Sequence, residues 1–269
     1  MGQSGWQLES DAPRAYEKYI VSALFDDWAR ELIATADLRR GERVLDVACG
    51  TGIVARHALS AVGPSGTVEA FDVNEGMLAV ARSIPANDGV RFKAGDAASA
   101  PVSDRSFDVV LCQQGLQYFP DRPAALREMR RVLVPSGRVA ISVWRPIDRQ
   151  PYFNALCHAV ETHVSPETAA LQRAAFTLGE PPAIRELLTS AGFSSIRITL
   201  AVRLMRAPAL LDFLPGYFSA TPMASAIAAL DSSARAAMIR EIDAAVRVYI
   251  DDSGLAVPVE CNVVTARSV

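Results

Sequence analysis

The sequence predicts an α/β fold in which a doubly wound, mostly parallel sheet is covered by helices on both faces. Three observations predict it. Short apolar runs alternate with amphipathic segments between residues 43 and 144, a rhythm typical of right-handed strand–helix–strand units. The first apolar run ends in a glycine-rich turn, and the second ends on Asp72. The 269 residues are 50% hydrophobic, which is enough to bury a large core.

The chain begins with a segment that has helical periodicity. Apolar and aromatic residues recur at three-to-four spacing between residues 12 and 40, among them Tyr16, Tyr19 and Trp28. We therefore expect residues 1–40 to form an N-terminal helical lid.

Seven strands are expected after this lid, in a Rossmann-like sheet. They are residues 43–47, 67–72, 90–94, 107–113, 138–144, 195–204 and 257–266, the last one antiparallel. The helices expected between them are residues 53–62, 75–82, 123–133 and 181–191. Residues 41–146 form the predicted core. Residues 147–269 complete the sheet and carry helical cap insertions near 150–180 and 208–250, which we expect to cover one end of the sheet.

Composition and charge exclude several classes of protein. A net charge of −3 and a pI near 5.7 leave no basic surface for nucleic acid. No apolar run is long enough for a membrane span, and no secretory signal is visible. The four cysteines form no CxxC pair and there are only three histidines, so no metal site is expected. We expect a cytoplasmic protein with reduced thiols. One interpretation of the alanine-rich segment 224–248 is a dimer face, so a homodimer is not excluded.

The stretch that ends the first strand, residues 44–52, reads VLDVACGTG. Gly50 and Gly52 fit the GxGxxG/A pattern, in which glycines let a ligand approach the backbone at a helix N-terminus. Asp72 lies 20 residues beyond Gly52, where a carboxylate can accept both hydroxyls of a ribose. These features suit NAD equally well, and a strand–turn–helix without a ligand is a further alternative.

Asp46 lies within this stretch and favours a different ligand. A fixed anion near the loop would repel the pyrophosphate of a dinucleotide. S-adenosylmethionine has no phosphate, and it carries a sulfonium cation and an ammonium group. The alternative is that Asp46 only caps its own loop.

Five segments in the same order resemble the class I S-adenosylmethionine-dependent methyltransferases, and together they cover residues 42–144. They are VLDVACGTG (44–52), VEAFDVNEGM (68–77), GDA (95–97), FDVVLC (107–112) and RVLVPSGR (131–138). The pattern is most similar to the small-molecule branch that includes the quinone-biosynthesis C-methyltransferases. Two positions depart from it. Ser136 stands where a glycine is usual, and Gln117 stands where many relatives have a histidine that could act as a base.

The resemblance implies a role for each matching residue toward S-adenosylmethionine. Asp46, Ala48, Gly50 and Gly52 would hold the methionine end, Asp72 the ribose, Val73 and Met77 the adenine faces, Gly95, Asp96 and Ala97 the adenine edge, and Gln113 would lie near the sulfonium. Tyr16 and Tyr19, spaced to share one face of the lid helix, would close over the methionine end. Core packing is the alternative for Met77 and the two tyrosines, and backbone hydrogen bonding is the alternative for Gln113.

The acceptor site is expected after the fourth strand and under the cap. Gln114, Gln117 and Tyr118 follow that strand at the carboxyl edge of the sheet, where ligands of open α/β sheets bind. Trp144, Phe213 and Tyr217 would wall a hydrophobic pocket suited to an aromatic, polyketide-like, quinone or lipid-like acceptor. A helix that simply packs on the sheet would explain the same aromatic residues.

No catalytic base is identified. Gln117, Tyr118 and His158 are weak candidates, and His163 is a further one. A base is needed only if the nucleophile must lose a proton.

We therefore expect an enzyme that moves a methyl group from S-adenosylmethionine to a small, fairly apolar acceptor and releases S-adenosylhomocysteine. The reaction is an in-line displacement, helped mainly by alignment, which supplies about 7–11 kcal/mol in favourable systems. An NAD-linked oxidoreductase and a non-catalytic S-adenosylmethionine-binding protein are the alternatives.

Overall fold

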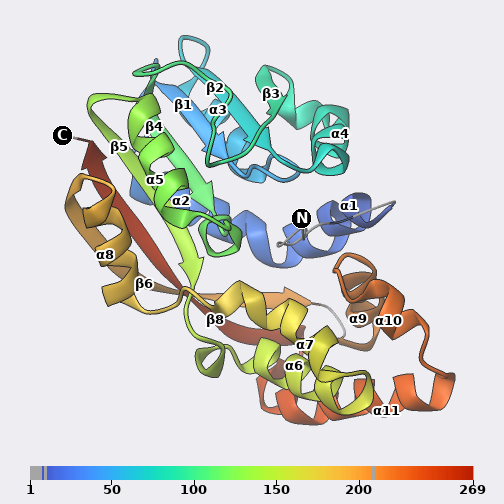
Figure 1. Ribbon diagram of the computed structural model, residues 1–269. Coiled ribbons are helices and arrows are strands. Elements are labelled where there is room, and N and C mark those ends of the chain that lie inside the picture. The colour runs from blue at the N-terminus through green and yellow to red at the C-terminus, as the bar shows by residue number, and fades with distance from the viewer. Residues whose placement is uncertain (1–7, 9–10, 208–209, 269) are drawn as a thin grey trace.

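The computed structural model describes Leu8, residues 11–207 and residues 210–268. Its centre is an eight-stranded sheet in which seven strands follow the order β3-β2-β1-β4-β5-β8-β6 and β7 pairs with β8 (Figure 1). The strands are β1 (Arg43–Val47), β2 (Thr67–Asp72), β3 (Val90–Ala94), β4 (Phe107–Gln113), β5 (Leu133–Trp144), β6 (Phe193–Ala207), β7 (Ile250–Asp251) and β8 (Gly254–Ser268).

The pairing confirms the predicted fold class. The first five strands of the order run parallel, and β8 lies antiparallel between β5 and β6. The last long strand is therefore antiparallel, as expected from the sequence. The eighth strand is β7, a two-residue element that pairs with the start of β8 through Ile250 and Asp251. Such a short strand leaves no alternating pattern in the sequence.

The N-terminal segment is helical but is not a regular α-helix. It consists of α1 (Ala12–Ala15), a ten-residue π-helix η1 (Tyr16–Phe25), and α2 (Asp26–Ala36). A π-helix bonds each amide to the carbonyl five residues earlier, so its turn is wider than that of an α-helix. This difference changes which side chains of the lid share a face.

The remaining helices occupy the segments expected from periodicity. They are α3 (Ile53–Val62), α4 (Glu75–Ser83), α5 (Arg122–Val132), α6 (Pro151–His163), α7 (Pro166–Arg173), α8 (Pro181–Ser190), α9 (Leu210–Ser219), α10 (Ala224–Ala228) and α11 (Ser232–Val246). Short 3₁₀ turns are η2 (Pro85–Asn87), η3 (Leu116–Tyr118), η4 (Ile147–Arg149), η5 (Ala174–Phe176) and η6 (Arg247–Tyr249). Side-chain caps fix several starts: Asn74 accepts from the Met77 amide at 3.1 Å, and Asp121 from the Ala124 amide at 2.8 Å.

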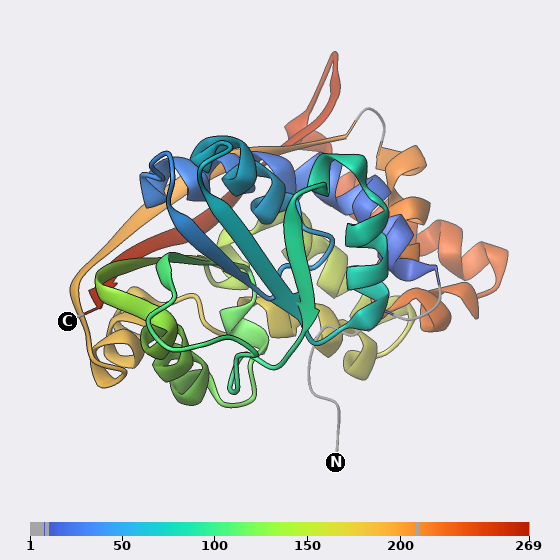
Figure 2. The same cartoon turned by 90° about the horizontal axis from the view of Figure 1, so that it is seen from above.

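Helices cover both faces of the sheet (Figure 2). Neighbours Val44 and Leu45 in β1 are both buried but belong to different hydrophobic clusters. Val44 packs in the cluster that contains Leu32 of α2, and Leu45 in the cluster that contains Leu126 of α5. Successive side chains of a strand point to opposite faces, so a strand buried on both sides reads as a continuous apolar run.

The cap helices α6, α7, α9, α10 and α11 lie beyond the carboxyl ends of the parallel strands, with η1 between them and the sheet (Figure 1). Within the described residues, no helix combines the length and the apolar character that a membrane crossing requires. The expected cytoplasmic location stays a prediction.

Candidate functional site

A cavity of about 400 Å³ lies at the carboxyl edge of the sheet, bordered by the lid and the cap. The ends of β1, β2 and β4 and the turn after β3 form one side of it. Side chains from η1, β5, α6, α7 and α9 form the other side. Residues from the predicted cofactor site and from the predicted acceptor site thus line one continuous space.

The glycine-rich turn approaches this cavity through Ala48 and Gly50. Both have left-handed backbones, with φ of +57° and +54°. A methyl group added to Gly50 would meet no atom within 4 Å, so the space beside this glycine is open. Gly52, with φ of +86°, does not line the cavity. Its Cβ position lies 2.9 Å from Nδ2 of Asn87, so the space beside this glycine is filled. Gly50 leaves room for a ligand, whereas Gly52 permits close packing.

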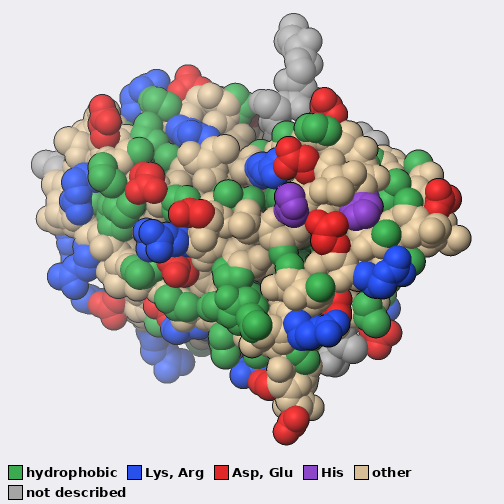
Figure 3. Space-filling model, turned by 90° about the horizontal axis from the view of Figure 1, so that it is seen from below, with side chains coloured by type: hydrophobic (Ala, Val, Ile, Leu, Met, Phe, Trp, Pro, Cys, Tyr) green, Lys and Arg blue, Asp and Glu red, His purple; other side chains and the backbone are tan. Residues whose placement is uncertain are grey.

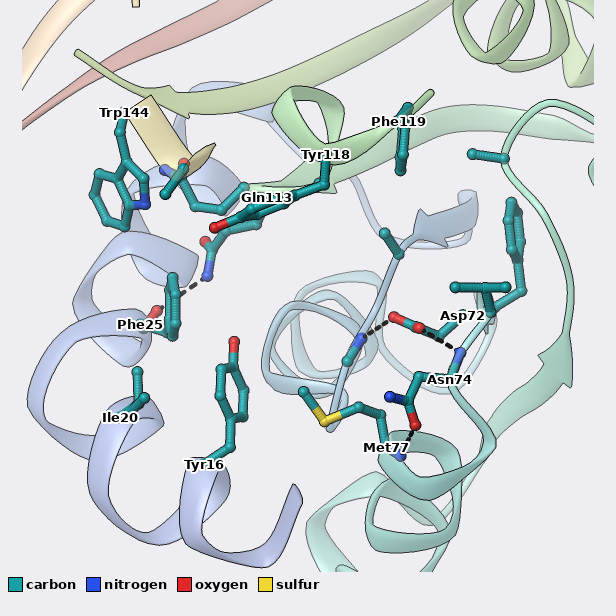
Figure 4. A pocket seen from close by; sticks show the side chains of 18 of the residues that line it. Tyr16, Ile20, Phe25, Asp72, Asn74, Met77, Gln113, Tyr118, Phe119 and Trp144 are labelled. Carbon is teal, nitrogen blue, oxygen red and sulfur yellow. Dashed lines mark hydrogen bonds between the residues drawn. The ribbon is translucent and has the colours of Figure 1, made fainter. Parts of the chain in front are cut away.

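Asp72 holds the turn in place from the end of β2 (Figure 4). Its Oδ2 accepts from the Gly50 amide and its Oδ1 from the Asn74 amide, both at 2.8 Å. Burial raises the pKa of this carboxyl, and the amides of Asn74, Gly50 and Val73 oppose that rise. A carboxylate has about four lone-pair sites, more than these amides occupy, so Asp72 can still accept a hydrogen bond from a hydroxyl group in the cavity.

Asp46 is not among the residues that line the cavity, and its predicted role at the methionine end stays a prediction. It belongs to β1, which is covered on both faces, and only 1% of the residue is exposed. Neither carboxylate oxygen has a hydrogen-bond partner of normal geometry among the described groups. Burial raises its pKa well above the usual value, the Asp72 charge adds to the rise, and the Ala55 amide opposes it. The predicted contact with the methionine end has no direct geometric support.

The predicted adenine residues line one end of the cavity. They are Val73, Met77, Gly95, Asp96 and Ala97. Val73 is 63% exposed, which is unusual for an apolar side chain beside a core and leaves a face free for packing. Sequence reasoning missed Asn74 as a lining residue (Figure 4), although an Asn before Glu75 is a helix-start signal.

The lid contributes Tyr16, Ile20, Leu24 and Phe25 to the cavity (Figure 4). Their spacing of four to five residues matches the wide turn of a π-helix. Tyr19 does not line the cavity, which corrects the prediction that it shares a face with Tyr16. It packs on α9, where the Cβ position of Gly216 lies 2.5 Å from its ring. The sequence pattern predicted a helix here but did not distinguish a π-helix from an α-helix.

An ion pair and a histidine–carboxylate hydrogen bond attach the lid to α3. Arg56 contacts Glu17 at 2.6 Å, and Nε2 of His57 contacts Asp26 at 2.7 Å. His57 played no part in the sequence prediction, and the structure assigns it to this attachment.

Aromatic and amide side chains form the end of the cavity nearest the cap. Trp144, Phe153 and Tyr217 line it together with Gln172 and Ala175. The Trp144 ring lies 6.0 Å from that of Phe25 and 6.4 Å from that of Phe153. The structure corrects the placement of Phe213, which lies behind this wall with its ring 5.6 Å from that of Tyr217.

Three glutamines lie at the carboxyl end of β4 and just after it, at positions 113, 114 and 117. Gln113 donates to the Phe25 carbonyl at 3.3 Å, while its Oε1 is buried with no hydrogen-bond partner among the described groups. Gln114 lines the cavity and accepts from Nε2 of Gln117 at 3.0 Å. Gln117 itself lies outside the lining, so the structure places it behind Gln114. Tyr118 lines the cavity, and burial raises the pKa of its hydroxyl above the usual value.

The two histidines suggested as bases lie beside Glu241 of α11, in the cap. Figure 3 shows histidine side chains (purple) next to acidic ones (red) on one face of the molecule. Nε2 of His163 is 2.9 Å from Glu241, and that of His158 is 3.8 Å from the same carboxylate. The side chain of His158 is 75% exposed, and neither histidine lines the cavity. This removes the geometric basis for both as bases. Although five residues separate them, both face α11. The described residues contain no cluster able to hold a metal ion.

Comparison with known proteins identifies the family. A family model described as a methyltransferase domain matches residues 44–137. A demethylmenaquinone methyltransferase of Staphylococcus aureus is 32% identical over 184 residues, which cover 64% of this chain and 76% of that protein. A ubiquinone/menaquinone biosynthesis C-methyltransferase of Cupriavidus metallidurans is 40% identical over 128 residues, which cover 45% of this chain and 53% of that protein. The chain thus spans about half the length of the Cupriavidus relative and about three quarters of the Staphylococcus one.

Solved structures support the same fold. A SAM-dependent methyltransferase from Aquifex aeolicus aligns with a TM-score of 0.56 and 18% identity, over 97% of this chain and 100% of that one. A Haemonchus contortus phosphoethanolamine N-methyltransferase in complex with S-adenosyl-L-methionine aligns with a TM-score of 0.60 and 19% identity, over 96% and 57%.

These findings agree with the five ordered motifs and with a ligand cavity at the carboxyl edge of a doubly wound sheet. They give no support to an NAD-linked oxidoreductase or to a non-catalytic binding protein. The chain belongs to the class I S-adenosylmethionine-dependent methyltransferases of the small-molecule branch.

Proposed function

We propose that this protein transfers a methyl group from S-adenosylmethionine to a small, apolar, aromatic acceptor. The observation that carries the proposal is the single cavity, which runs from Asp72 at the end of β2 to Trp144 and Tyr217 under the cap. A donor at one end and an acceptor at the other would share one space, as an in-line displacement requires.

The residues at the sheet edge fit the methyl donor. The open space beside Gly50 can receive the methionine end, Asp72 has lone pairs available for the ribose hydroxyls, and the exposed Val73 can pack on the adenine. The proposed donor site also includes seven further residues that line the same space: Ala48, Met77, Gly95, Asp96, Ala97, Gln113 and Tyr16. When bound, S-adenosylmethionine supplies a methyl group already activated by its sulfonium.

Asp46 and Gly52 act indirectly in this proposal. Gly52 allows the turn to pack tightly beside Asn87, and Asp46 places a buried carboxyl in β1 just before that turn. In this proposal both act through the turn, and neither contacts the ligand from the lining of the cavity.

The protein's own contribution to the reaction is alignment and exclusion of water. The lid side chains Tyr16 and Phe25 and the wall residues Trp144 and Phe153 cover the space where acceptor and methyl group would meet. Gln114, held by Gln117, and Tyr118 would orient the acceptor. No side chain lining this cap-side end of the described cavity carries a charge. The wall therefore favours an acceptor that is neutral as well as apolar.

The acceptor class follows from the shape and chemistry of the wall. The aromatic side chains that line the wall favour a planar ring over a flexible aliphatic chain. The names of the curated relatives add quinone-type rings, methylated at carbon, to the acceptors worth testing. A homodimer and the absence of a nucleic-acid partner stay predictions.

Calorimetric titration of the full chain with S-adenosylmethionine, S-adenosylhomocysteine and NAD tests the donor site. We expect the first two to bind and NAD to show no heat of binding. Binding of NAD alone would overturn the proposal.

Transfer itself is measured with tritiated S-adenosylmethionine and a panel of hydroxylated naphthalenes and benzenes, followed by extraction of the labelled product. We expect label in at least one aromatic product. Matched aliphatic alcohols serve as controls, and transfer confined to them would contradict the proposed acceptor class.

A further inference from the structure

Gln172 is the buried amide of the cap wall. It lies on α7, is 3% exposed, and lines the cavity together with Trp144 and Tyr217. It also lies outside residues 44–137, the part of the chain that matches the methyltransferase family model. The motifs of the proposed donor site therefore do not account for its presence in an otherwise largely aromatic wall.

A neighbouring hydroxyl fixes the orientation of this amide. The Tyr217 hydroxyl donates a hydrogen bond to Oε1 of Gln172 over 3.1 Å, and both residues are buried. The Tyr217 ring is held in turn by edge-on contact with Tyr152 at 5.7 Å. Because a carboxamide is planar, occupation of its oxygen determines where its nitrogen points.

The amide nitrogen of Gln172 has an unused donor. It makes no hydrogen bond to any group that the structure describes. It also keeps some accessible surface, unlike the buried polar side-chain atoms that lack a partner. Since the residue lines the cavity, its N–H groups are reachable from the cavity. A donor covered by an apolar ligand would lose its access to water and gain nothing in return.

We propose that Gln172 recognises the acceptor by donating a hydrogen bond to one of its oxygen atoms, and that Tyr217 is the positioning residue for this bond. This inference rests on the proposed function, because it assigns the cap-side end of the cavity to the acceptor. Gln172 comes from the cap, whereas Asp72 comes from the sheet edge. The recognised oxygen therefore lies on the part of the acceptor remote from the donor site. The acceptor class narrows to planar apolar molecules with a carbonyl, ether or hydroxyl oxygen at that end.

The size of the effect follows from the chemistry of a neutral hydrogen bond. Such a bond in a buried site corresponds to roughly a three- to tenfold change in affinity. A ligand of equal shape without the oxygen should bind more weakly by this factor, and only while the donor is present.

The test uses two probes of matched shape, 1-tetralone and tetralin, which differ by one carbonyl oxygen. Each is titrated into the full chain saturated with S-adenosylhomocysteine, and binding is followed by quenching of tryptophan fluorescence. For the wild-type protein we expect the ketone to bind about fivefold more tightly than the hydrocarbon. Gln172→Met should bring that ratio to about one by weakening the ketone only. Tyr217→Phe should give a ratio between those two values.

Tyr152→Phe is the matched control, because Tyr152 also carries a buried hydroxyl and contacts Tyr217, but does not line the cavity. We expect it to preserve the ratio. A wild-type ratio of one, a ratio unchanged in Gln172→Met, or a ratio lost in Tyr152→Phe alone would overturn the role of Gln172. Equal weakening of both probes in Gln172→Met would also overturn it, since that result indicates a structural role. An unchanged ratio in Tyr217→Phe would overturn the positioning role of Tyr217.

Two further measurements keep this inference separate from the proposed function. The affinity of each variant for S-adenosylhomocysteine reports whether the donor site remains folded. The probe titrations are repeated without S-adenosylhomocysteine. Failure of the wild-type chain to bind S-adenosylhomocysteine would contradict the proposed function, while the probe ratio would still decide whether Gln172 recognises oxygen.

Discussion

At the scale of single residues, Gly50 and Gly52 look equivalent in the sequence but differ in the structure. Both have positive φ, a conformation that costs an L-residue about 1 kcal/mol or more. The Cβ position of Gly50 meets only open space, whereas that of Gly52 lies 3.0 Å from the ring of Phe92. One glycine therefore keeps the cavity open and the other allows the turn to pack.

We expect Gly50→Ala to weaken binding of S-adenosylhomocysteine about tenfold, because the new methyl group occupies part of the proposed methionine site. Its melting temperature should stay within a few degrees of wild type, since the cost of positive φ is about 1 kcal/mol. Gly52→Ala should lower the melting temperature clearly more, because the methyl group clashes with buried neighbours. Calorimetry and thermal unfolding measure the two effects, and the reverse pattern would contradict these assignments.

Asp72 leads to a prediction about pH. Its pKa is raised by burial, and only the ionised carboxylate can accept both ribose hydroxyls while it holds the Gly50 and Asn74 amides. Affinity for S-adenosylhomocysteine should therefore be complete well above this raised pKa and should fall as pH drops through it. The loss should begin at a higher pH than for an ordinary aspartate, whose pKa is about 3.9.

Asp72→Asn should weaken binding at neutral pH and remove this pH dependence, and Asp72→Ala should weaken binding at least about tenfold. Asp108→Asn is the control, because Asp108 pairs with Arg43 at the opposite end of β4. Equal affinity of wild type and Asp72→Ala would remove Asp72 from the proposed site.

At the scale of elements, the turn before the main part of β5 explains one departure from the family pattern. Ser136 has φ of +65°, the conformation that favours the glycine usual at this position. The pairing of β4 with β5 skips from Leu133 to Arg138 across this turn. Gly137, the next residue, is closely surrounded, with its Cβ position 2.9 Å from the Val134 carbonyl oxygen.

We expect Ser136→Gly to raise the free energy of unfolding by about 0.5 to 1 kcal/mol, and so to stabilise the protein, because it removes the strain of a left-handed serine. Gly137→Ala, the matched change one residue later, should destabilise the protein because its methyl group meets backbone oxygen. Urea unfolding of both variants checks this pair, and a destabilised Ser136→Gly would show that the serine side chain stabilises the turn more than its conformation costs.

The lid shows the limit of periodicity at the same scale. Three-to-four spacing identified a helix over residues 12–40 but assumed α geometry, and so placed Tyr16 and Tyr19 on one face. The wider turn of η1 instead brings Tyr16 and Ile20 to the cavity and leaves Tyr19 against α9. Apolar spacing of four fits both helix types over short distances, so only packing against the sheet and cap reveals which one forms.

At the scale of the whole molecule, one hydrophobic cluster joins the lid, the sheet and the cap. The cluster contains residues from each part: Trp28 of α2, Val44 of β1, Trp144 of β5, Tyr217 of α9 and Ile242 of α11. A shared core of this kind favours unfolding in a single transition. The division into lid, core and cap insertions stays a prediction, and it describes sequence segments more than separate folding units.

We expect Ile242→Ala, which empties a fully buried site in α11, to destabilise the whole protein by about 2–5 kcal/mol. The far-ultraviolet circular dichroism and tryptophan fluorescence of this variant should melt together, at a temperature below that of wild type. Addition of S-adenosylhomocysteine should raise that single melting temperature. Two separate transitions, of which the ligand shifts only one, would show that the cap folds independently of the donor site.

The sequence by itself determined the fold class and the succession of strands and helices over residues 43–144, and it supplied the residues proposed for the donor end of the cavity. Apolar runs, glycines and carboxylates such as Asp72 act through neighbours close in the chain or through the shared edge of a parallel sheet, so local pattern is sufficient. Only the tertiary structure decided that Asp46 is covered, that Tyr19 and Phe213 lie behind the wall, and that the histidines face α11. It also decided that Gln172 reaches the cavity. These outcomes depend on which faces of distant helices meet, and residues 150–250 carry too many interchangeable apolar positions for spacing to specify that packing.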